Sequence, residues 1–293
     1  MKTRSLYSLL IILLVVGCGQ DNTDQTTRRG YRYVHHVDEA GQKAVPGEYA
    51  YFNIVMRHGD SILNTSYGMA DIPRIRIPNA EEFSTETPII VDALEIMGKG
   101  DSLTLYYPLD SLENVPPAFA HIDVVEYDLA LVDIKTGEEY QAEMDSILAL
   151  RQVEMQATQA RKPEVAAFAS ETLSDYNQGN LGVETTPSGL KYIIHEEGTG
   201  DMPSPGDMVS VHYFGTFMDG NSFDTSFEGG EPFTFPLGQG RAIPGWDEGI
   251  AYLMEGAKAS LIVPPALGYG ETGYMDIPGN TTLYFYVELK EVN

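Results

Sequence analysis

The segment 232–250, PFTFPLGQGRAIPGWDEGI, decides the fold of the C-terminal part of the chain. It begins with a strand-like run, Phe233–Pro236, and passes through turn-forming glycines and prolines to Trp246, the only tryptophan of the chain. A short helical pattern, Trp246–Met254, follows and stops before Gly256, because glycine commonly ends helices. One short helix among strand-like runs predicts a sheet with that helix packed against it.

Strand-like runs continue on both sides of this segment. Apolar and β-branched residues recur in short stretches between Gly, Pro and Asp, as is typical of strands. The runs are Leu190–His195, Met208–Phe217, Ala259–Val263 and Thr282–Val292. With Phe233–Pro236 they make five strands. The pattern indicates an α+β arrangement, an antiparallel half-barrel sheet wrapped on a short helix.

Aromatic and aliphatic residues interrupt the polar turns of this region. Each one alone would be read as ordinary core, and an aspartate beside them as a turn residue. In a cleft between a helix and a curved sheet, however, apolar walls with a few fixed polar groups are typical of a small-ligand pocket. The residues are Tyr213, Phe223, Asp224, Phe233, Ile243, Trp246, Tyr269 and Phe285.

Four segments of this region resemble, in order and spacing, those of FKBP-type peptidyl-prolyl cis-trans isomerases. They are VSVHYFGTFMDGNSFDTS at 209–226, PFTFPLGQGRAIPGWDEGI at 232–250, LMEGAKASLIVPPALGYG at 253–270 and NTTLYFYVELKEV at 280–292. The resemblance covers residues 184–293, which we expect to form the catalytic domain. It implies an isomerase that acts on proline-containing polypeptides and needs no cofactor and no metal.

The resemblance also implies roles for the pocket residues. Trp246 would form the floor under the prolyl ring, and the walls would be Tyr213, Phe233 and Phe285. The polar contacts would be a backbone N–H from Ile243, the hydroxyl of Tyr269, and the carboxylate of Asp224. Asp224, beside Phe223, would face the twisting amide while the Tyr213 hydroxyl holds it.

Three further residues are expected to contact the substrate: Ala242, Tyr274 and Ile277. Two features here depart from the family pattern: Ala242 stands where a larger aliphatic residue is common, and the loop 274–277, which contains Tyr274 and Ile277, is one residue short. A third departure is Gly229, which stands where some members have an arginine near the aspartate. These departures bear on substrate preference more than on activity.

The chemistry of prolyl isomerisation needs little besides such a pocket. An amide loses its resonance when it is twisted, and this creates a barrier of about 18–20 kcal/mol. The twisted amide is less polar than the planar one, so a dry apolar pocket favours it, which is transition-state complementarity. The alternative is a chaperone or scaffold that keeps the fold and binds peptides without catalysis.

Other classes of function find little support. A net charge of −25 argues against a nucleic-acid partner, because phosphates would repel the chain. The six histidines lack the close spacing of metal ligands, so no metal site is expected. The glycine-rich segment at 238–245 lacks the G-K-[ST] ending of a P-loop, and no serine has the setting of a hydrolase nucleophile.

Residues 31–136 look like a diverged copy of the same domain. PGEYAYF at 46–52 recurs as PGDMVSV at 205–211, and SILNTSY at 61–67 recurs as NSFDTSF at 221–227. The pocket positions differ: Ile90 stands for Trp246, Leu63 and Asn64 stand for Phe223 and Asp224, and Glu113 falls near the position of Tyr269. We therefore expect a second FKBP-like domain without isomerase activity.

A helical segment, residues 137–183, is expected to join the two domains. Glu138–Arg161 is rich in good helix formers, Pro163 interrupts the pattern, and Glu164–Tyr176 resumes it before Gly179. An apolar stripe runs along the second part at Val165, Phe168, Leu173 and Tyr176. Packing against the chain's own domains, a dimer through this segment, and holding of a client are the alternatives for that stripe.

The first residues have the layout of a lipoprotein signal peptide. Lys2 and Arg4 precede an apolar run, Leu9–Val16, which is too short to span a bilayer, and VVGC at 15–18 resembles a lipobox. We expect residues 1–17 to be removed, Cys18 to carry a lipid anchor, and residues 18–30 to be a flexible tether. This places the chain in a bacterial cell envelope, at the outer membrane and facing the periplasm.

Overall fold

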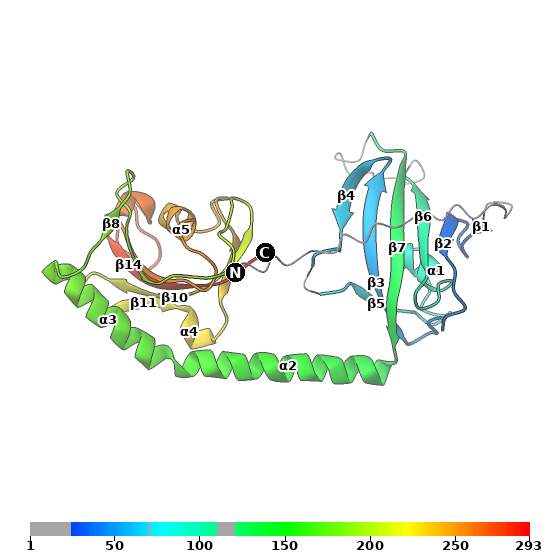
Figure 1. Cartoon of the computed structure of the whole chain (residues 1–293), viewed down its shortest axis with the longest axis horizontal. Coiled ribbons are helices and arrows are strands. Elements are labelled where there is room, and N and C mark those ends of the chain that lie inside the picture. The colour runs from blue at the N-terminus through cyan, green and yellow to red at the C-terminus, as the bar shows by residue number, and fades with distance from the viewer. Residues whose placement is uncertain (1–24, 70, 110–120) are drawn as a thin grey trace, which may run out of the picture. The chain divides into compact units, whose positions relative to one another are not determined.

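The computed structural model describes residues 25–69, 71–109 and 121–293 (Figure 1). The chain divides into two compact units, Met1–Met144 and Asp145–Asn293. Three features expected from the sequence lie outside the described residues: the signal peptide, the lipidation site Cys18, and Glu113.

The N-terminal unit is built on a seven-stranded antiparallel sheet in the order β1-β2-β6-β7-β3-β4, with β5 also paired to β3. One short helix, α1 (Ile90–Leu94), packs against this sheet. The strands are β1 (Gln25–Thr26), β2 (Arg32–Val37), β3 (Tyr49–His58), β4 (Ser61–Thr65), β5 (Arg74–Arg76), β6 (Ser102–Pro108) and β7 (Val124–Lys135).

The C-terminal unit contains a second seven-stranded antiparallel sheet, ordered β11-β10-β14-β13-β9-β8, with β12 paired to β10. Three short helical segments interrupt the strands: α4 (Ser226–Gly229), α5 (Pro244–Ile250) and the 3-10 helix Pro265–Leu267. The strands are β8 (Glu184–Thr185), β9 (Lys191–Glu196), β10 (Met208–Phe217), β11 (Ser222–Thr225), β12 (Phe233–Pro236), β13 (Lys258–Val263) and β14 (Leu283–Val292).

The expected α+β class with two antiparallel sheets and a helical segment is confirmed. Read from the other end, the first sheet has the same strand order as the second, with β3 and β10 in matching positions. The sequence predicts five of the seven C-terminal strands. It misses β8 and β11, which contain two and four residues and lack an apolar run.

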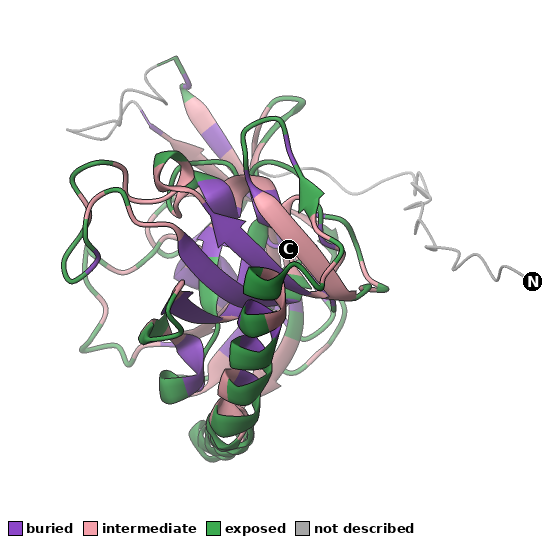
Figure 2. Cartoon of the chain, turned by 90° about the vertical axis from the view of Figure 1, so that its left-hand side faces the viewer, coloured by how far each residue is buried: buried purple, intermediate pink, exposed green. Residues whose placement is uncertain are grey.

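The core of the C-terminal unit lies between α5 and the concave face of the sheet, whose buried strands are prominent in Figure 2. The backbone of α5 comes close to β13, because an added Cβ at Gly245 would lie 2.6 Å from a Val263 methyl group and one at Gly249 would lie 2.9 Å from Leu261. Larger residues at these two positions would push the helix away. The helix begins at Pro244, a favoured first helical residue, two residues before the expected start.

The helical segment consists of α2 (Gly137–Ala160) and α3 (Lys162–Gln178), which ends at Gly179 in the left-handed conformation. Helix α3 packs on the convex face of the C-terminal sheet, where Val165 and Leu173 join Phe214 and Tyr284 in a buried cluster. Helix α2 has no buried residue. Of the alternatives for the apolar stripe, packing on the chain's own domain therefore applies to Val165 and Leu173.

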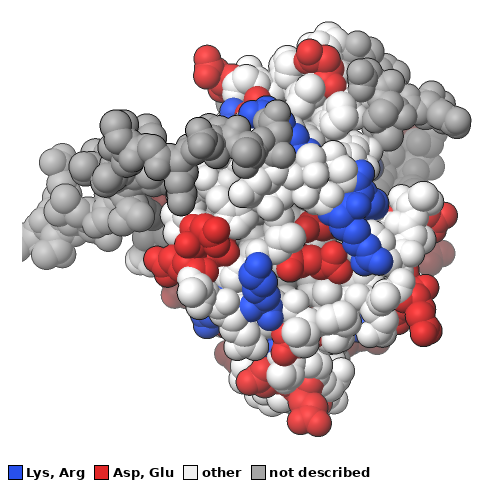
Figure 3. Space-filling model, turned by 90° about the vertical axis from the view of Figure 1, so that its right-hand side faces the viewer, with Lys and Arg blue, Asp and Glu red and all other residues white. Residues whose placement is uncertain are grey.

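Charged groups are distributed rather than gathered on the side of the molecule in Figure 3, where acidic and basic side chains lie among uncharged ones. Within the described residues, no helix has both the length and the apolar character needed to cross a membrane.

Candidate active site

Helix α5 and the loop before it place the floor of a hollow in the C-terminal unit. The backbone N–H groups of Gly238 and Gly240 donate to the two carboxylate oxygens of Asp247, at 2.9 and 3.1 Å. Both glycines have φ near +70°, a conformation that other residues rarely adopt. Asp247 thus fastens the loop to the first turn of α5, and this fixes Trp246 two residues after the helix begins.

Aromatic rings surround Trp246, which is only 5% exposed. Its ring makes edge-to-face contacts with Tyr213 on β10, at 5.1 Å between centroids, and with Phe285 on β14, at 5.3 Å. Phe233 on β12 lies 6.2 Å away, and Phe223 on β11 stands perpendicular to Phe285 at 5.5 Å. These geometries are favourable for aromatic pairs, so the rings hold one another in place.

The rings leave an open hollow of about 490 Å³. Its lining includes every residue that the sequence predicts for the pocket except Ile277, and adds Arg241 and Pro244. The lining residues are Tyr213, Phe223, Asp224, Phe233, Arg241, Ala242, Ile243, Pro244, Trp246, Tyr269, Tyr274 and Phe285. The hollow is therefore not filled by the chain's own side chains.

Ile277 does not line the hollow. It is 9% exposed and belongs to the hydrophobic core of the unit. Its backbone exchanges two hydrogen bonds with Tyr274, of 2.8 and 2.9 Å, across a tight turn in which Met275 has a left-handed conformation. This turn directs Ile277 into the core and leaves Tyr274 at the hollow, stacked on Tyr269 at 5.3 Å.

One carboxylate is held at the hollow by a neighbouring hydroxyl, as the sequence predicts. The hydroxyl of Tyr213 donates to Asp224 Oδ2 at 2.7 Å. Burial, followed by this hydrogen bond, raises the pKa of Tyr213, so the hydroxyl keeps its proton at neutral pH. Burial also raises the pKa of Tyr269, and the negative charge of Asp224 adds to that effect.

Two donors at the hollow are free to bind a ligand. Among the described residues, none accepts a hydrogen bond from the backbone N–H of Ile243 or from the hydroxyl of Tyr269. The indole nitrogen of Trp246 also lacks a partner in the part of the chain that the structure describes, but this atom is buried and is not exposed to a ligand. Unpaired donors around an apolar hollow suit a ligand that brings carbonyl groups.

The sequence gives only weak signals for Arg241 and Pro244. Arg241 precedes two expected pocket residues, but a basic residue in a glycine-rich loop is normally read as a solvated side chain. In the hollow it supplies a positive charge, while the position expected for such a charge from the resemblance, Gly229, lies in α4. The sequence pattern indicates a turn at Pro244, and in the structure this residue both begins α5 and lines the hollow.

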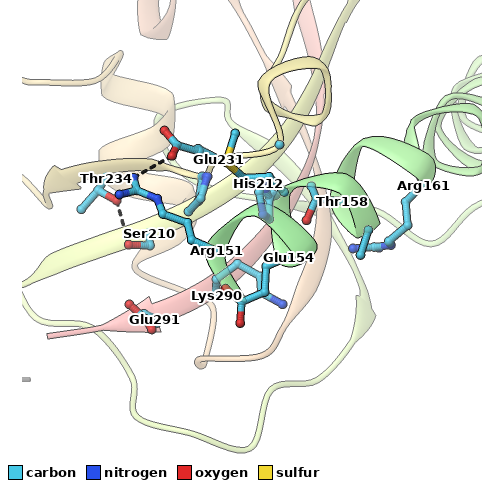
Figure 4. Close-up of a pocket in the computed structure, with 14 residues that line it drawn as sticks. Arg151, Glu154, Thr158, Arg161, Ser210, His212, Glu231, Thr234, Lys290 and Glu291 are labelled. Carbon is cyan, nitrogen blue, oxygen red and sulfur yellow. Dashed lines mark hydrogen bonds and ion pairs between the residues drawn. The ribbon is translucent and has the colours of Figure 1, made fainter. Parts of the chain in front are cut away.

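A second hollow, of about 660 Å³, lies between the second half of α2 and strands β10, β12 and β14 (Figure 4). Its walls are polar, and two of its cations are already paired: Arg151 with Glu231 at 2.6 Å and Arg161 with Glu288 at 2.5 Å. The carboxylate of Glu288 is 3% exposed and also accepts a hydrogen bond from Tyr286. These pairs hold α2 and the junction between α2 and α3 to the rest of the C-terminal unit, and the aromatic hollow remains the better candidate for catalysis.

Comparisons with known proteins match the unit that contains the aromatic hollow. The family model described as FKBP-type peptidyl-prolyl cis-trans isomerase matches residues 200–290. A protein of Aeromonas hydrophila, FKBP-type peptidyl-prolyl cis-trans isomerase FkpA, is 49% identical over 113 residues, which are 39% of this chain and 41% of that protein. The chain thus spans about two fifths of the length of that relative.

Two further similarities extend over more of the chain. A probable FKBP-type peptidyl-prolyl cis-trans isomerase of Haemophilus influenzae is 36% identical over 191 residues, which are 59% of this chain and 77% of that protein. Among solved structures, that of FkpA from Escherichia coli is 37% identical and covers 54% of this chain and 73% of its own, with a TM-score of 0.38.

Proposed function

The chain belongs to the family of FKBP-type peptidyl-prolyl cis-trans isomerases, and from this premise we propose that its C-terminal unit catalyses the cis–trans isomerisation of Xaa-Pro bonds. The observation that carries the proposal is the open hollow over Trp246, with aromatic walls and two unpaired hydrogen-bond donors, the N–H of Ile243 and the hydroxyl of Tyr269. A pyrrolidine ring is small, apolar and flanked by carbonyl groups, and it matches both features of the hollow.

The proposed mechanism is preferential binding of the twisted amide. The planar Xaa-Pro amide is polar because of its resonance, and the twisted one is less so. Rings that exclude water therefore stabilise the twisted form over both planar isomers, which lowers the barrier. The N–H of Ile243 and the hydroxyl of Tyr269 would bind the carbonyl groups on either side and hold the proline over Trp246.

Asp224 is assigned an electrostatic role in this mechanism. Its carboxylate is kept in one orientation by the Tyr213 hydroxyl at 2.7 Å. A fixed negative charge beside the reacting amide stabilises the transition state when the part of the amide that faces it becomes more positive as resonance is lost. No nucleophile or proton transfer is required.

The N-terminal unit is proposed to bind peptide without catalysis. It has the same strand order as the C-terminal unit, and a hollow formed by its described residues is small, about 170 Å³, and has no aromatic lining. The lining consists of Ile54, Met56, Asn64, Thr65, Ser66, Met69 and Pro73. Flexible methionines accommodate varied apolar side chains, which suits a peptide-holding function.

We further propose that the chain acts on proline-containing proteins of a bacterial envelope, anchored through a lipid on Cys18 at the outer membrane and facing the periplasm. The basis is the lipobox-like VVGC at 15–18. Exposed Ile147, Leu150 and Val153, which lie three residues apart on one side of α2, support a dimer through that helix. A Cys18→Ser variant should move from the membrane fraction to the soluble fraction of the producing cells.

The experiment that tests the proposed activity is a protease-coupled prolyl peptide assay with the purified chain. Wild type should accelerate isomerisation, and Trp246→Leu should reduce the rate strongly because it removes the floor of the hollow. Tyr252→Phe is the matched control, since Tyr252 is an exposed aromatic of the same unit that stacks on Tyr192 outside the hollow. Peptide binding with no acceleration by the wild type would favour the non-catalytic chaperone or scaffold.

A further inference from the structure

We propose that the N-terminal unit contains a binding site for a divalent transition-metal ion, with Zn²⁺ as the best-suited ion, formed by His35, Asp38 and Asp101. The site is independent of the prolyl isomerase function, because all three residues belong to the other unit. The sequence predicts no metal site, because its histidines lack the close spacing of metal ligands along the chain. Pairing of strands brings Asp101 next to residues that are far from it in sequence.

Two neighbouring strands position the three ligands. His35 is in β2, Asp38 directly follows that strand, and Asp101 directly precedes β6, the antiparallel partner of β2. The pairing shifts register between His35 and Val37, which marks a bulge. Bulges redirect side chains near functional sites. One ligand atom from each of the three residues lies within 4.8 Å of the other two.

His35 has an unused ligand atom in this cluster. Its Nδ1 is buried and has no hydrogen-bond partner among the residues that the structure describes. The nearest carboxylate oxygen, Asp38 Oδ2, is 3.7 Å away, which is too far for a hydrogen bond. A buried polar atom without a partner is unfavourable, and the neutral imidazole nitrogen is a common metal ligand. A metal ion would satisfy it.

Asp101 is a buried carboxylate without a neutralising charge. It is 1% exposed, and within the described ranges no Lys, Arg or His forms an ion pair with it at bonding distance. One oxygen accepts the backbone N–H of Glu39 at 2.7 Å and the other accepts that of Gly98 at 2.6 Å. Each oxygen keeps a second lone pair, and a bound cation would offset the unfavourable burial of the charge.

The surroundings hold Asp101 in position before any ion binds. The loop around Gly41 lies against residues 98–99 so closely that an added Cβ on Gly41 would be 2.5 Å from the carbonyl oxygen of Lys99. The two N–H donors to Asp101 come from these two segments. Such hydrogen bonds to a ligating carboxylate are typical of the groups that orient metal ligands.

The ligand set determines the class of ion. One imidazole nitrogen and two carboxylates suit Zn²⁺, with bonds of about 2.0–2.2 Å and water in the fourth position. Tetrahedral coordination requires ligand atoms about 3.4 Å apart, close to the 3.7 Å between His35 and Asp38. Asp38 is 73% exposed and is therefore free to move toward an ion, and the separations among the three ligand atoms, which are at most 4.8 Å, would have to shorten on binding. The net charge of −25 also raises the local concentration of cations.

The test is a titration of the purified chain with Co²⁺, followed by its visible absorption, and then displacement of Co²⁺ by Zn²⁺. A Cys18→Ser background removes the only thiol as a competing ligand. The test variants are His35→Gln and Asp38→Asn. The matched control is His58→Gln, because His58 and Asp123 form a similar pair in the same unit, at 4.0 Å, and among the described residues they belong to no group of three metal ligands.

Wild type and His58→Gln should bind one ion with equal affinity, and each test variant should bind roughly tenfold or more weakly. Zn²⁺ should also raise the melting temperature of wild type but not that of Asp38→Asn. Asp38 is exposed, so its variant should fold even if His35→Gln does not. Absence of saturable binding by wild type, or wild-type affinity in Asp38→Asn, would overturn the proposal.

Discussion

Replacement of Tyr213 by phenylalanine should slow isomerisation through Asp224 rather than through loss of the pocket wall. The change keeps the ring that contacts Trp246 and removes only the hydroxyl, which donates to Asp224 Oδ2 at 2.7 Å. A hydrogen bond to a charged group contributes about 1.5–3 kcal/mol when it is shielded from water. Because Asp224 is exposed, solvent reduces this to about 1 kcal/mol, or roughly a fivefold loss of kcat/KM.

A double-mutant cycle separates this effect from a direct contact of Tyr213 with the substrate. Tyr213→Phe, Asp224→Ala and the double variant should be assayed with the same prolyl peptide, and their melting temperatures compared. If Tyr213 acts by orienting Asp224, its removal should have little effect once Asp224 is absent, so the two losses should not add. Fully additive losses, or a rate for Tyr213→Phe equal to that of wild type, would refute the reasoning.

Three other predictions concern the hollow and the helix that packs behind the sheet. Trp246→Leu should lower kcat/KM roughly tenfold or more in the prolyl peptide assay, because the floor of the hollow loses its ring contacts. Arg161→Met should lower the free energy of unfolding in urea by about 2–3 kcal/mol, since it leaves the buried Glu288 unpaired, and Arg161→Met with Glu288→Leu should recover most of that loss. Burial lowers the pKa of His195 from 6.5, so as the pH falls the imidazole is protonated in the unfolded chain before it is protonated in the folded one. The contribution of the neutral imidazole to stability should therefore be complete above pH 6.5 and be lost as the pH falls toward the folded pKa. His195→Gln should flatten the dependence of the free energy of unfolding on pH in this range.

The sequence is sufficient for most of the C-terminal fold because long strands carry a clear apolar pattern. Strand β10 has the expected bounds, Met208–Phe217, and β14 begins one residue after its expected start. Helix α5 is shorter than its pattern, since Gly245 and Gly249 weaken the helix while allowing it to approach β13. The short strands β8 and β11 depend on pairing with their neighbours and leave no local signal.

The sequence predicts site residues whose position follows from the pattern and order of their own segments. It predicts less well those whose position depends on tertiary structure alone. Asp224 and Tyr213 meet because β10 and β11 pair. The order and spacing of these two segments match those of the family, and this match indicates the contact in advance. The inward direction of Ile277 depends on the turn at Met275, which the sequence pattern does not reveal. Likewise, the approach of Asp101 to His35 depends on the register of two strands, so no spacing rule finds it.

The most direct measurement is NMR exchange spectroscopy of a prolyl peptide in the presence of catalytic amounts of the chain. Cis and trans signals of the free peptide interconvert in tens of seconds or longer, too slowly for exchange cross-peaks. We expect wild type to produce such cross-peaks and Trp246→Leu to weaken them strongly. Shifted peptide signals without cross-peaks would mean that the aromatic hollow binds proline but does not turn its peptide bond.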